Sequence, residues 1–468
     1  MASASSIEAV TEQVGGSFRD PSGFVFVRDG RVLRQVNRRY QDNYDHLMRS
    51  GLYDALTSQG LLVPHQELGP AEAAGPDAYQ VLAPEPIDVI SYPYEWCFSQ
   101  LREAALTTLN IQKIAFEHGM SLKDASAYNV QFQGSRPVFI DTLSFEKYQE
   151  GAPWIGYRQF CQHFLAPLAL IAHVDVRLAS LLRNHVDGIP LDLAAGLLPG
   201  KTRLKPSLLM HIHLHAKSQE RSADDASKGE VERKKVGRLG LQGLFDSLYK
   251  AVESLSWTPK GDWANYYSAT NYSDESFALK REIVSAFIDQ ANPDSVWDLG
   301  ANTGVFSRVA SEKGIRTTAI DFDPAAVEAN FQQCRKDGTE NLLPLVGDLT
   351  NPSSGIGWAG EERQSLEDRG PAGLVMALAL IHHLAIANNV PLEKTADYFS
   401  RLGKSLIIEF VPKEDSQVRR MLRTREDIFD RYDQAGFEGA FQTRFVIENS
   451  QAVAGSSRWL YLMRRRCE

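Results

Sequence analysis

The stretch that decides the fold of this chain is DLGANTG, residues 298–304, which closes a short apolar run beginning at Ser295. Its glycines let the backbone approach a ligand where a Cβ would clash. Carboxylates also end the next two apolar runs: Asp321, with Asp323 close behind it, and then Asp348. A carboxylate at the end of a second strand can bind both hydroxyls of a ribose. The spacing therefore predicts a nucleoside site.

Two classes of nucleoside ligand fit a glycine loop followed by an acid. A dinucleotide site needs the triplet GxGxxG, so that the pyrophosphate meets a helix N-terminus. This chain has GANTG instead, and it places Asp298 two residues before the first glycine. That carboxylate is an awkward neighbour for a pyrophosphate and a suitable partner for an ammonium. The expected ligand is a nucleoside with a cationic amino-acid tail, of which S-adenosylmethionine (SAM) is the obvious example.

The C-terminal half alternates apolar strands with helical segments. This alternation predicts βαβ units and a parallel sheet, hence the α/β fold class. Two strand-like runs with no helix between them, 441–447 and 458–463, predict a hairpin that adds an antiparallel edge. The other expected strands are 295–299, 317–320, 342–346, 373–380 and 405–410, and the expected helices are 278–287, 306–313, 324–335 and about 392–402.

From Asp262 to Arg466 the chain resembles the class I SAM-dependent methyltransferases. The runs LALIHHLAIANNVPL and LIIEFVPKEDSQV resemble more closely the subfamily of nodulation-protein NoeA-like methyltransferases. The resemblance implies a seven-stranded Rossmann-like sheet with an antiparallel last strand, SAM as cofactor, and Asp348 as the acid that contacts the adenine amino group. The cofactor-binding residues it implies are Asp298, Gly300, Asn302, Gly304, Asp321, Asp323 and Asp348.

In the resembled family the segment before the first strand folds over SAM. Tyr267, Asn271 and Tyr272 are the candidates for that lid, and ordinary aromatic packing at a domain seam is the alternative. Each acid also has a plain structural alternative. Asp298 can cap a helix, and the two later acids can satisfy turns.

Methyl transfer is an in-line displacement that requires an aligned nucleophile and the exclusion of water. His382 and His383 follow the expected fourth strand, where an open sheet meets its ligand crevice, and we expect one of them to be the catalytic base. The alternative is that His383 packs against the following helix while His382 orients a loop. The chain lacks the Asn/Asp-Pro-Pro-aromatic motif of nucleic-acid amino methylators at this place. Cys334, mid-helix without a proline, is not a base-methylating nucleophile.

Other polar residues surround the expected crevice. Glu409 ends the fifth strand and is expected to border the acceptor, whereas Lys413–Asp415 are expected to form a solvated loop. The insertion 351–370 carries Trp358, which either covers the substrate or pins the loop.

The N-terminal half predicts a hairpin over Gly23–Arg34 and a helix over 100–117. Residues 94–146 resemble the C-lobe of aminoglycoside-phosphotransferase-like kinases, because Asp124, Asn129 and Asp141 have the spacing of a catalytic loop and a metal-binding acid. Leu122-Lys123 precedes the loop, and neither a glycine-rich loop nor a strand lysine is evident. We therefore expect an α+β, degenerate kinase-like accessory or recognition module; satisfied turns are the alternative. The triplet His211, His213 and His215 is expected at a helix end, not in a metal site.

The polar, charged segment 216–238 predicts a flexible linker between domain 1–215 and domain 239–468. The 468 residues are 43% hydrophobic with a net charge of −9. No stretch approaches the ~20 apolar residues of a membrane helix, and the acidic balance argues against nucleic acid. The N-terminus lacks the pattern of a secretory signal, and four cysteines without a CxxC pair fit the cytoplasm.

These features predict a SAM-dependent methyltransferase acting on an O or N nucleophile of a small molecule, sugar or glycan. Two alternatives stay open: methylation of a protein recruited by the N-terminal half, and a non-catalytic scaffold that binds SAM.

Overall fold

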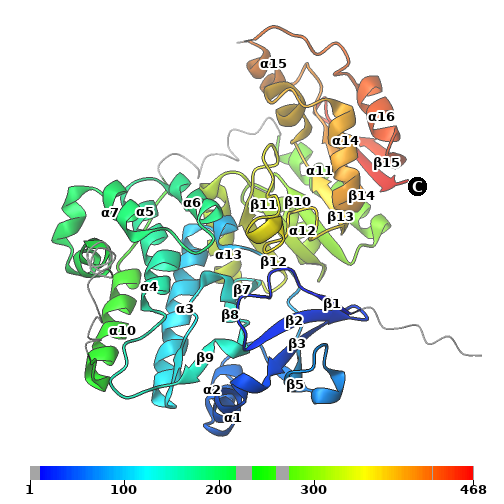
Figure 1. The fold of residues 1–468 in the computed structure, drawn as a ribbon. Helices are drawn as coiled ribbons and strands as arrows, with labels where there is room; N and C mark the ends of the chain where they lie inside the picture. The colour runs from blue at the N-terminus through cyan, green and yellow to red at the C-terminus, as the bar shows by residue number, and fades with distance from the viewer. Residues whose placement is uncertain (1–10, 218–234, 260–272, 424, 467–468) are drawn as a thin grey trace, which may run out of the picture.

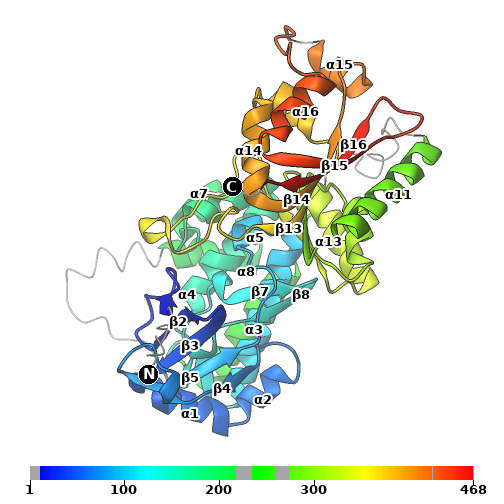
Figure 2. The same ribbon diagram turned by 90° about the vertical axis from the view of Figure 1, so that its right-hand side faces the viewer.

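The computed structural model of the chain describes residues 11–217, 235–259, 273–423 and 425–466. Two halves pack against one another (Figures 1 and 2). The C-terminal half is built on one large sheet with helices on its faces, and the N-terminal half combines a smaller sheet with a group of helices. The predicted α/β class of the C-terminal half is confirmed.

The large sheet has the strand order β12-β11-β10-β13-β14-β16-β15. Strands β10 to β14 run parallel, and β16 lies antiparallel between β14 and β15. The order reverses between β10 and β13, which makes that place the switch point where open α/β sheets bind ligands. The strands are β10 (Ser295–Leu299), β11 (Arg316–Asp321), β12 (Leu342–Val346), β13 (Ala372–Ala377), β14 (Gly403–Phe410), β15 (Phe445–Ala452) and β16 (Trp459–Arg465).

Most predicted elements of this half are present with small shifts in their bounds. The first residues of the run expected as a strand from 441 belong to helix α16 instead, so β15 begins at Phe445. Helix α11 begins after Ser273, whose hydroxyl accepts a hydrogen bond from the backbone N–H of Ser276. The helices are α11 (Asp274–Ala291), α12 (Val305–Ser311), α13 (Pro324–Asp337), α14 (Leu392–Leu402), α15 (Ser416–Leu422) and α16 (Gln434–Gln442).

The N-terminal half holds an antiparallel sheet of the order β1-β2-β3-β5-β4. The predicted hairpin is present, with Asp29 and Gly30 at its turn, both in the left-handed region. A long buried helix, α3 (Phe98–Glu117), follows the sheet. The strands are β1 (Thr11–Gln13), β2 (Gly23–Arg28), β3 (Arg31–Asn37), β4 (His65–Glu67) and β5 (Ala78–Pro84), with two further pairs, β6 (Met120–Leu122) with β9 (Phe145–Lys147) and β7 (Val130–Gln133) with β8 (Arg136–Phe139).

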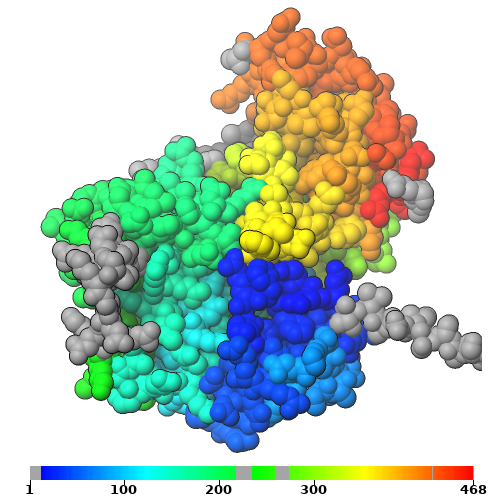
Figure 3. Space-filling model, in the orientation of Figure 1, coloured from blue at the N-terminus to red at the C-terminus, as the bar shows by residue number. Residues whose placement is uncertain are grey.

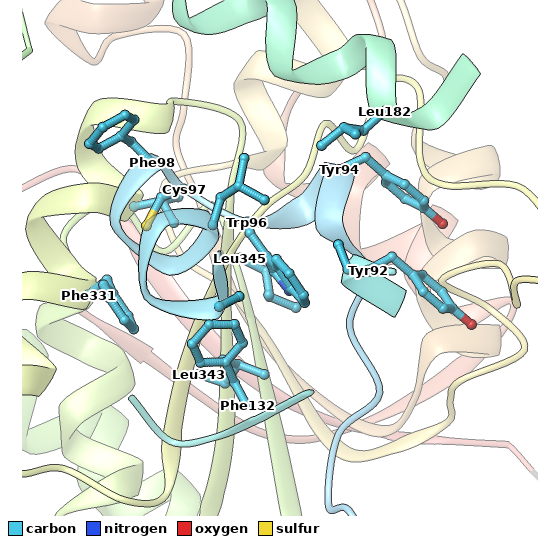
Figure 4. Packing of buried hydrophobic residues seen from close by; sticks show 14 of the residues in the cluster. Tyr92, Tyr94, Trp96, Cys97, Phe98, Phe132, Leu182, Phe331, Leu343 and Leu345 are labelled. Atoms are coloured by element: carbon cyan, nitrogen blue, oxygen red, sulfur yellow. The ribbon is translucent and has the colours of Figure 1, made fainter. Parts of the chain in front are cut away.

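The crossover from β12 to β13 contains no α-helix. Residues 347–371 are all described, and their one helical piece is the 3-10 turn Trp358–Gly360. Parallel strands are usually joined by a helix that covers one face of the sheet. Here the N-terminal half covers this part of the sheet: the aromatic side chains of Trp96 and Phe132 lie beside Leu345 and Leu343 of β12 (Figure 4).

Buried hydrogen bonds reinforce this contact between the halves. The side-chain amide of Gln100 donates to the carbonyl oxygen of Pro344 at 3.0 Å, on the edge strand β12. Glu328 of α13 accepts from the backbone N–H of Ser99 at 3.0 Å, so a carboxylate of one half caps a helix of the other. An apolar face and a helix end would both be uncovered if the halves separated.

Helix α10 (Arg238–Glu253) packs with the N-terminal half, although the sequence predicted that residues from 239 onward belong to the C-terminal domain. Phe245 on α10 meets the rings of Phe116 and Trp154 edge-on, at 5.4 Å between centroids in both cases. Leu241, Phe245 and Leu248 form the buried apolar face of α10.

The insertion 351–370 lies against the N-terminal segment between β1 and β2, where yellow and dark blue atoms meet in Figure 3. Arg19 donates to both carboxylate oxygens of Glu362, at 2.9 and 2.6 Å. Gly15 and Gly16 allow the close approach, because a Cβ on either would lie within 2.8 Å of a carbonyl oxygen of Glu361 or Glu362.

Candidate functional site

The predicted carboxylates lie at the same edge of the large sheet. Asp298 is paired with Ala319 across β10 and β11, and Asp321 is paired with Val346 across β11 and β12. Asp348 comes two residues after β12. Because these strands are parallel and adjacent, the structure brings the three acids to one end of the switch point.

Asp321 is tied directly to the glycine loop. Its side chain accepts from the backbone N–H of Asn302 at 2.7 Å and from that of Asp323 at 2.9 Å. The carboxylate is buried, and burial raises its pKa. These backbone donors hold it in one orientation while leaving lone pairs on each oxygen for a further donor.

Asp298 lies deeper, with 2% of its surface exposed. The hydroxyl of Ser307 on α12 donates to its carboxylate at 2.6 Å. The pKa of Asp298 is raised to about 6: burial is the main cause, the hydrogen bond from Ser307 acts against it, and the nearby charge of Asp321 adds to it. Ionised Asp298 is thus a desolvated negative charge, which an approaching cation would stabilise.

The glycine loop has an unusual backbone. Gly300, Asn302 and Gly304 all have positive φ, at 78°, 50° and 78°. A Cβ on Gly304 would lie 2.4 Å from the side chain of Asn330, so this glycine makes room for protein rather than for a ligand. A Cβ on Gly300 would lie 3.3 Å from Leu380, which brings the loop after β13 against the glycine loop.

The remaining cofactor candidates divide into three cases. Asp323 caps α13 by accepting from the backbone N–H of Ala325, a sufficient reason for an acid there. Asp348 is exposed and accepts from the backbone N–H and hydroxyl of Thr350, and it lines a small pocket at the end of β12. Tyr272, with Tyr267 and Asn271, lies outside the described residues.

His382 and His383 follow β13 and have different surroundings. His382 is 2% exposed, its Nδ1 atom has no hydrogen-bond partner among the described residues, and burial lowers its pKa to about 3. His383 is exposed, and its pKa is lowered first by partial desolvation and then by Arg458. Both rings are therefore neutral at pH 7. Ala379, three residues earlier, has a φ of 51°, rare for a residue with a Cβ and typical of strained functional loops.

A buried ionic network close enough to His382 to affect its pKa was not predicted from the sequence. Lys280 on α11 donates to Glu409 at 2.6 Å, and Arg458 donates to Asp415 at 2.8 Å. Asp415 is buried and caps α15, which corrects the expectation of a solvated loop at this position. The network is hard to predict from the sequence, because its four charged residues come from three distant segments of the chain.

The kinase-like candidates of the N-terminal half pair among themselves and with an arginine. Arg34 on β3 lies 2.5 Å from a carboxylate oxygen of Asp141, whose other oxygen accepts from the hydroxyl of Ser144. Asn129 donates to the same hydroxyl at 3.1 Å. Asp124 accepts from the backbone N–H of Ser126. The guanidinium of Arg34 is therefore already paired with Asp141, the carboxylate that would have to bind a metal ion.

The histidine triplet lies in a helical segment, in and directly after the π-helical piece Leu209–Leu214, and the predicted helix end lies outside the described residues. His211 is bonded to Tyr157 and Ser247, and His213 is bonded to Thr202. Within the described part of the chain, no group of three or more His, Cys, Asp or Glu side chains is placed to hold a metal ion. No helix in the same part is long and apolar enough to cross a membrane.

Trp358, at the insertion's 3-10 turn, is 75% exposed and so does not pin the loop. Its backbone N–H donates to Glu362 at 2.8 Å, which closes the turn.

The sheet order, with acids at the ends of neighbouring parallel strands, defines an open α/β protein. No family model matches the chain. It is 37% identical to nodulation protein NoeA of Rhizobium meliloti (strain 1021) over 463 residues. The alignment covers 97% of this chain and 96% of that protein. The chain belongs to the family of nodulation protein NoeA.

Solved structures match smaller parts of the chain. The PH0226 protein of Pyrococcus horikoshii OT3 is 16% identical with a TM-score of 0.32, over 43% of this chain and 99% of that one. The N-methyltransferase NodS of Bradyrhizobium japonicum WM9 is 13% identical with a TM-score of 0.30, over 41% and 98%. The bifunctional kinase-methyltransferase WbdD is 15% identical with a TM-score of 0.29, over 43% and 46%. Likenesses of this size do not bear on what the chain does.

Proposed function

We propose that the chain is a SAM-dependent methyltransferase that acts on an O or N nucleophile of a small molecule, sugar or glycan. The observation that carries the proposal is the alignment of Asp298, Asp321 and Asp348 at the ends of three neighbouring parallel strands. A nucleoside with a cationic tail is the ligand that needs acids at all three places.

The residues fit this cofactor in charge and position. Asp298 is a buried carboxylate with a raised pKa, so an ammonium or sulfonium nearby would relieve its desolvation. Asp321 keeps lone pairs for two ribose hydroxyls, and exposed Asp348 would accept from the adenine amino group. Phe322, next to Asp321 and 73% exposed, offers a ring to the flat face of a purine.

The cofactor, when bound, would supply the activated methyl group. The protein then has to align the acceptor and to take its proton. We assign the role of general base, which accepts the proton of the methyl acceptor, to His383, because this side chain is exposed and neutral at pH 7. His382 is a poorer base, since its pKa of about 3 leaves little driving force for proton transfer.

The N-terminal half, in this proposal, is an accessory module rather than a phosphotransferase. The Arg34–Asp141 ion pair neutralises the acid that would hold the metal. The proposed domains are 1–215 and 239–468, and helix α10 at the start of the second stretch packs against α3 of the N-terminal module, so we place the boundary between the modules after Glu253.

The test is methyl transfer by the full chain. Tritiated SAM is incubated with the protein and fractionated lysate, and label is followed in small-molecule, glycan and protein fractions. Label in a small-molecule or glycan fraction that is lost in Asp321→Ala supports the proposal. Label in protein alone favours the recruitment alternative, and SAM binding without transfer to any fraction favours the scaffold.

A further inference from the structure

The small pocket at the end of β12 has a wall from the other half of the chain. Gly347, Asp348 and Ser353 line it from the C-terminal half. Glu95, which lies just before α3 in the N-terminal half, lines it as well. The proposed adenine acid and a residue more than 250 positions earlier therefore face the same space.

Glu95 is fixed in place by a full set of partners. It is 5% exposed, and Arg369 donates to both of its carboxylate oxygens, at 2.9 and 2.5 Å. The backbone N–H of Tyr92 donates to one oxygen at 2.9 Å, and the hydroxyl of Ser353 donates to the other at 3.2 Å. Arg369 also donates to the carbonyl of Ile90 at 2.8 Å. A buried pair that is this well satisfied is a rigid anchor.

Through hydrogen bonds to Ser353 and Arg369, Glu95 contacts both ends of the insertion. Ser353 lies five residues after Asp348, and Arg369 lies just before β13. Since no α-helix orders residues 347–371, the position of the loop that carries Asp348 depends on contacts outside the loop. Glu95 contacts both of its ends.

We propose that Glu95 is a positioning residue for the cofactor, which holds the loop 347–353 so that Asp348 meets the adenine amino group. The N-terminal half thereby sets the affinity for the nucleoside part of the cofactor, and the site is composite. This inference rests on the proposed SAM-binding function.

The sharpest variant is Ser353→Ala, because it removes the link between Glu95 and the loop while Arg369 still neutralises the buried carboxylate. We expect the KM and the calorimetric Kd for SAM to rise about fivefold, the loss of one hydrogen bond, with kcat unchanged. Ser353→Thr keeps the hydroxyl and should restore the affinity. The double variant Glu95→Leu with Arg369→Met removes the anchor without leaving a buried charge and should weaken binding further.

A matched control is Glu340→Ala, which breaks the exposed Arg136–Glu340 ion pair between the same two halves at the opposite end of β12. Its affinity for SAM should equal that of the wild-type chain. The inference is overturned if Ser353→Ala and the double variant both bind SAM as tightly as the wild type does. If the wild-type chain itself does not bind SAM, it is the proposed function that fails.

Discussion

The side chain of Asp321 accepts a hydrogen bond from the backbone N–H of Asn302 at 2.7 Å. The contact joins the end of β11 to the glycine loop that follows β10, so it fixes the position of these two segments relative to one another. The proposed ribose acid is therefore also a structural support of the loop. Its removal should affect both the ligand and the local backbone, which makes the conservative change Asp321→Asn a useful partner to the alanine variant.

Asp298→Asn should make the ligand-free protein more stable at neutral pH. The pKa of about 6 lies above the ordinary value of 3.8, so the folded state disfavours the ionised form. The resulting destabilisation is absent below pH 3.8, grows between pH 3.8 and 6, and is complete above pH 6. The substitution should raise the free energy of unfolding by about 1–3 kcal/mol at pH 7.5 and by little at pH 4. Urea unfolding at the two pH values measures the difference.

The same Asp298 variant should bind SAM at least about tenfold more weakly, because it lacks the charge that faces the cationic tail. Equal stabilisation at both pH values would contradict the assigned pKa. An unchanged affinity for SAM would contradict the assigned role.

The two histidines should differ in their effect on turnover. His383→Ala should lower kcat by about 100-fold, the usual contribution of a general base, with little change in the Kd for SAM. His382→Ala should instead lower stability, because it leaves a cavity in a buried site. Steady-state kinetics with the acceptor found in the transfer assay gives the comparison. A wild-type kcat in the His383→Ala variant would contradict the assignment of His383 as the general base.

The contact between the halves should be essential for folding. Trp96→Ala should lower the free energy of unfolding by about 3–5 kcal/mol, because Trp96 is buried against the large sheet. Trp358→Ala is the matched control, since that side chain is 75% exposed, and it should change stability by less than about 0.5 kcal/mol. Urea denaturation followed by far-ultraviolet circular dichroism reads both. Similar stability for the two variants would show that the halves are independent.

The N-terminal half should not bind Mg-ATP. Arg34 already neutralises Asp141, and a metal would have to displace it. Calorimetric titration of Mg-ATP into the full chain should give no heat of binding. A binding signal that disappears in Asp141→Ala would instead restore an active nucleotide site.

Local patterns predicted the large sheet well because its strands are short apolar runs, three of which have Asp298, Asp321 or Asp348 at or just beyond their end. The pattern is local, so it survives without knowledge of the neighbours. The bounds were less accurate where two elements adjoin: Phe441 is apolar enough for a strand, but it lies on the buried face of α16. The packing of α10 against α3 could not be predicted, because an apolar helix face indicates that the helix is buried but does not indicate which element covers it.

The sequence did not predict Glu95 or the Lys280–Glu409 pair, because each partnership joins segments more than 100 residues apart. A buried ion pair produces no periodic pattern in the sequence, since each of its residues, taken alone, looks like an ordinary charged surface residue. The pairing of Arg34 with Asp141 escaped prediction for the same reason.

The most direct test of the central claim is calorimetric titration of SAM into the full-length wild-type chain and into Asp321→Ala and Asp321→Asn. We predict one SAM bound per wild-type chain, and binding at least about tenfold weaker in both variants, with circular dichroism showing that each remains folded. Absence of SAM binding by the wild-type chain, or wild-type affinity in the two variants, would contradict the account.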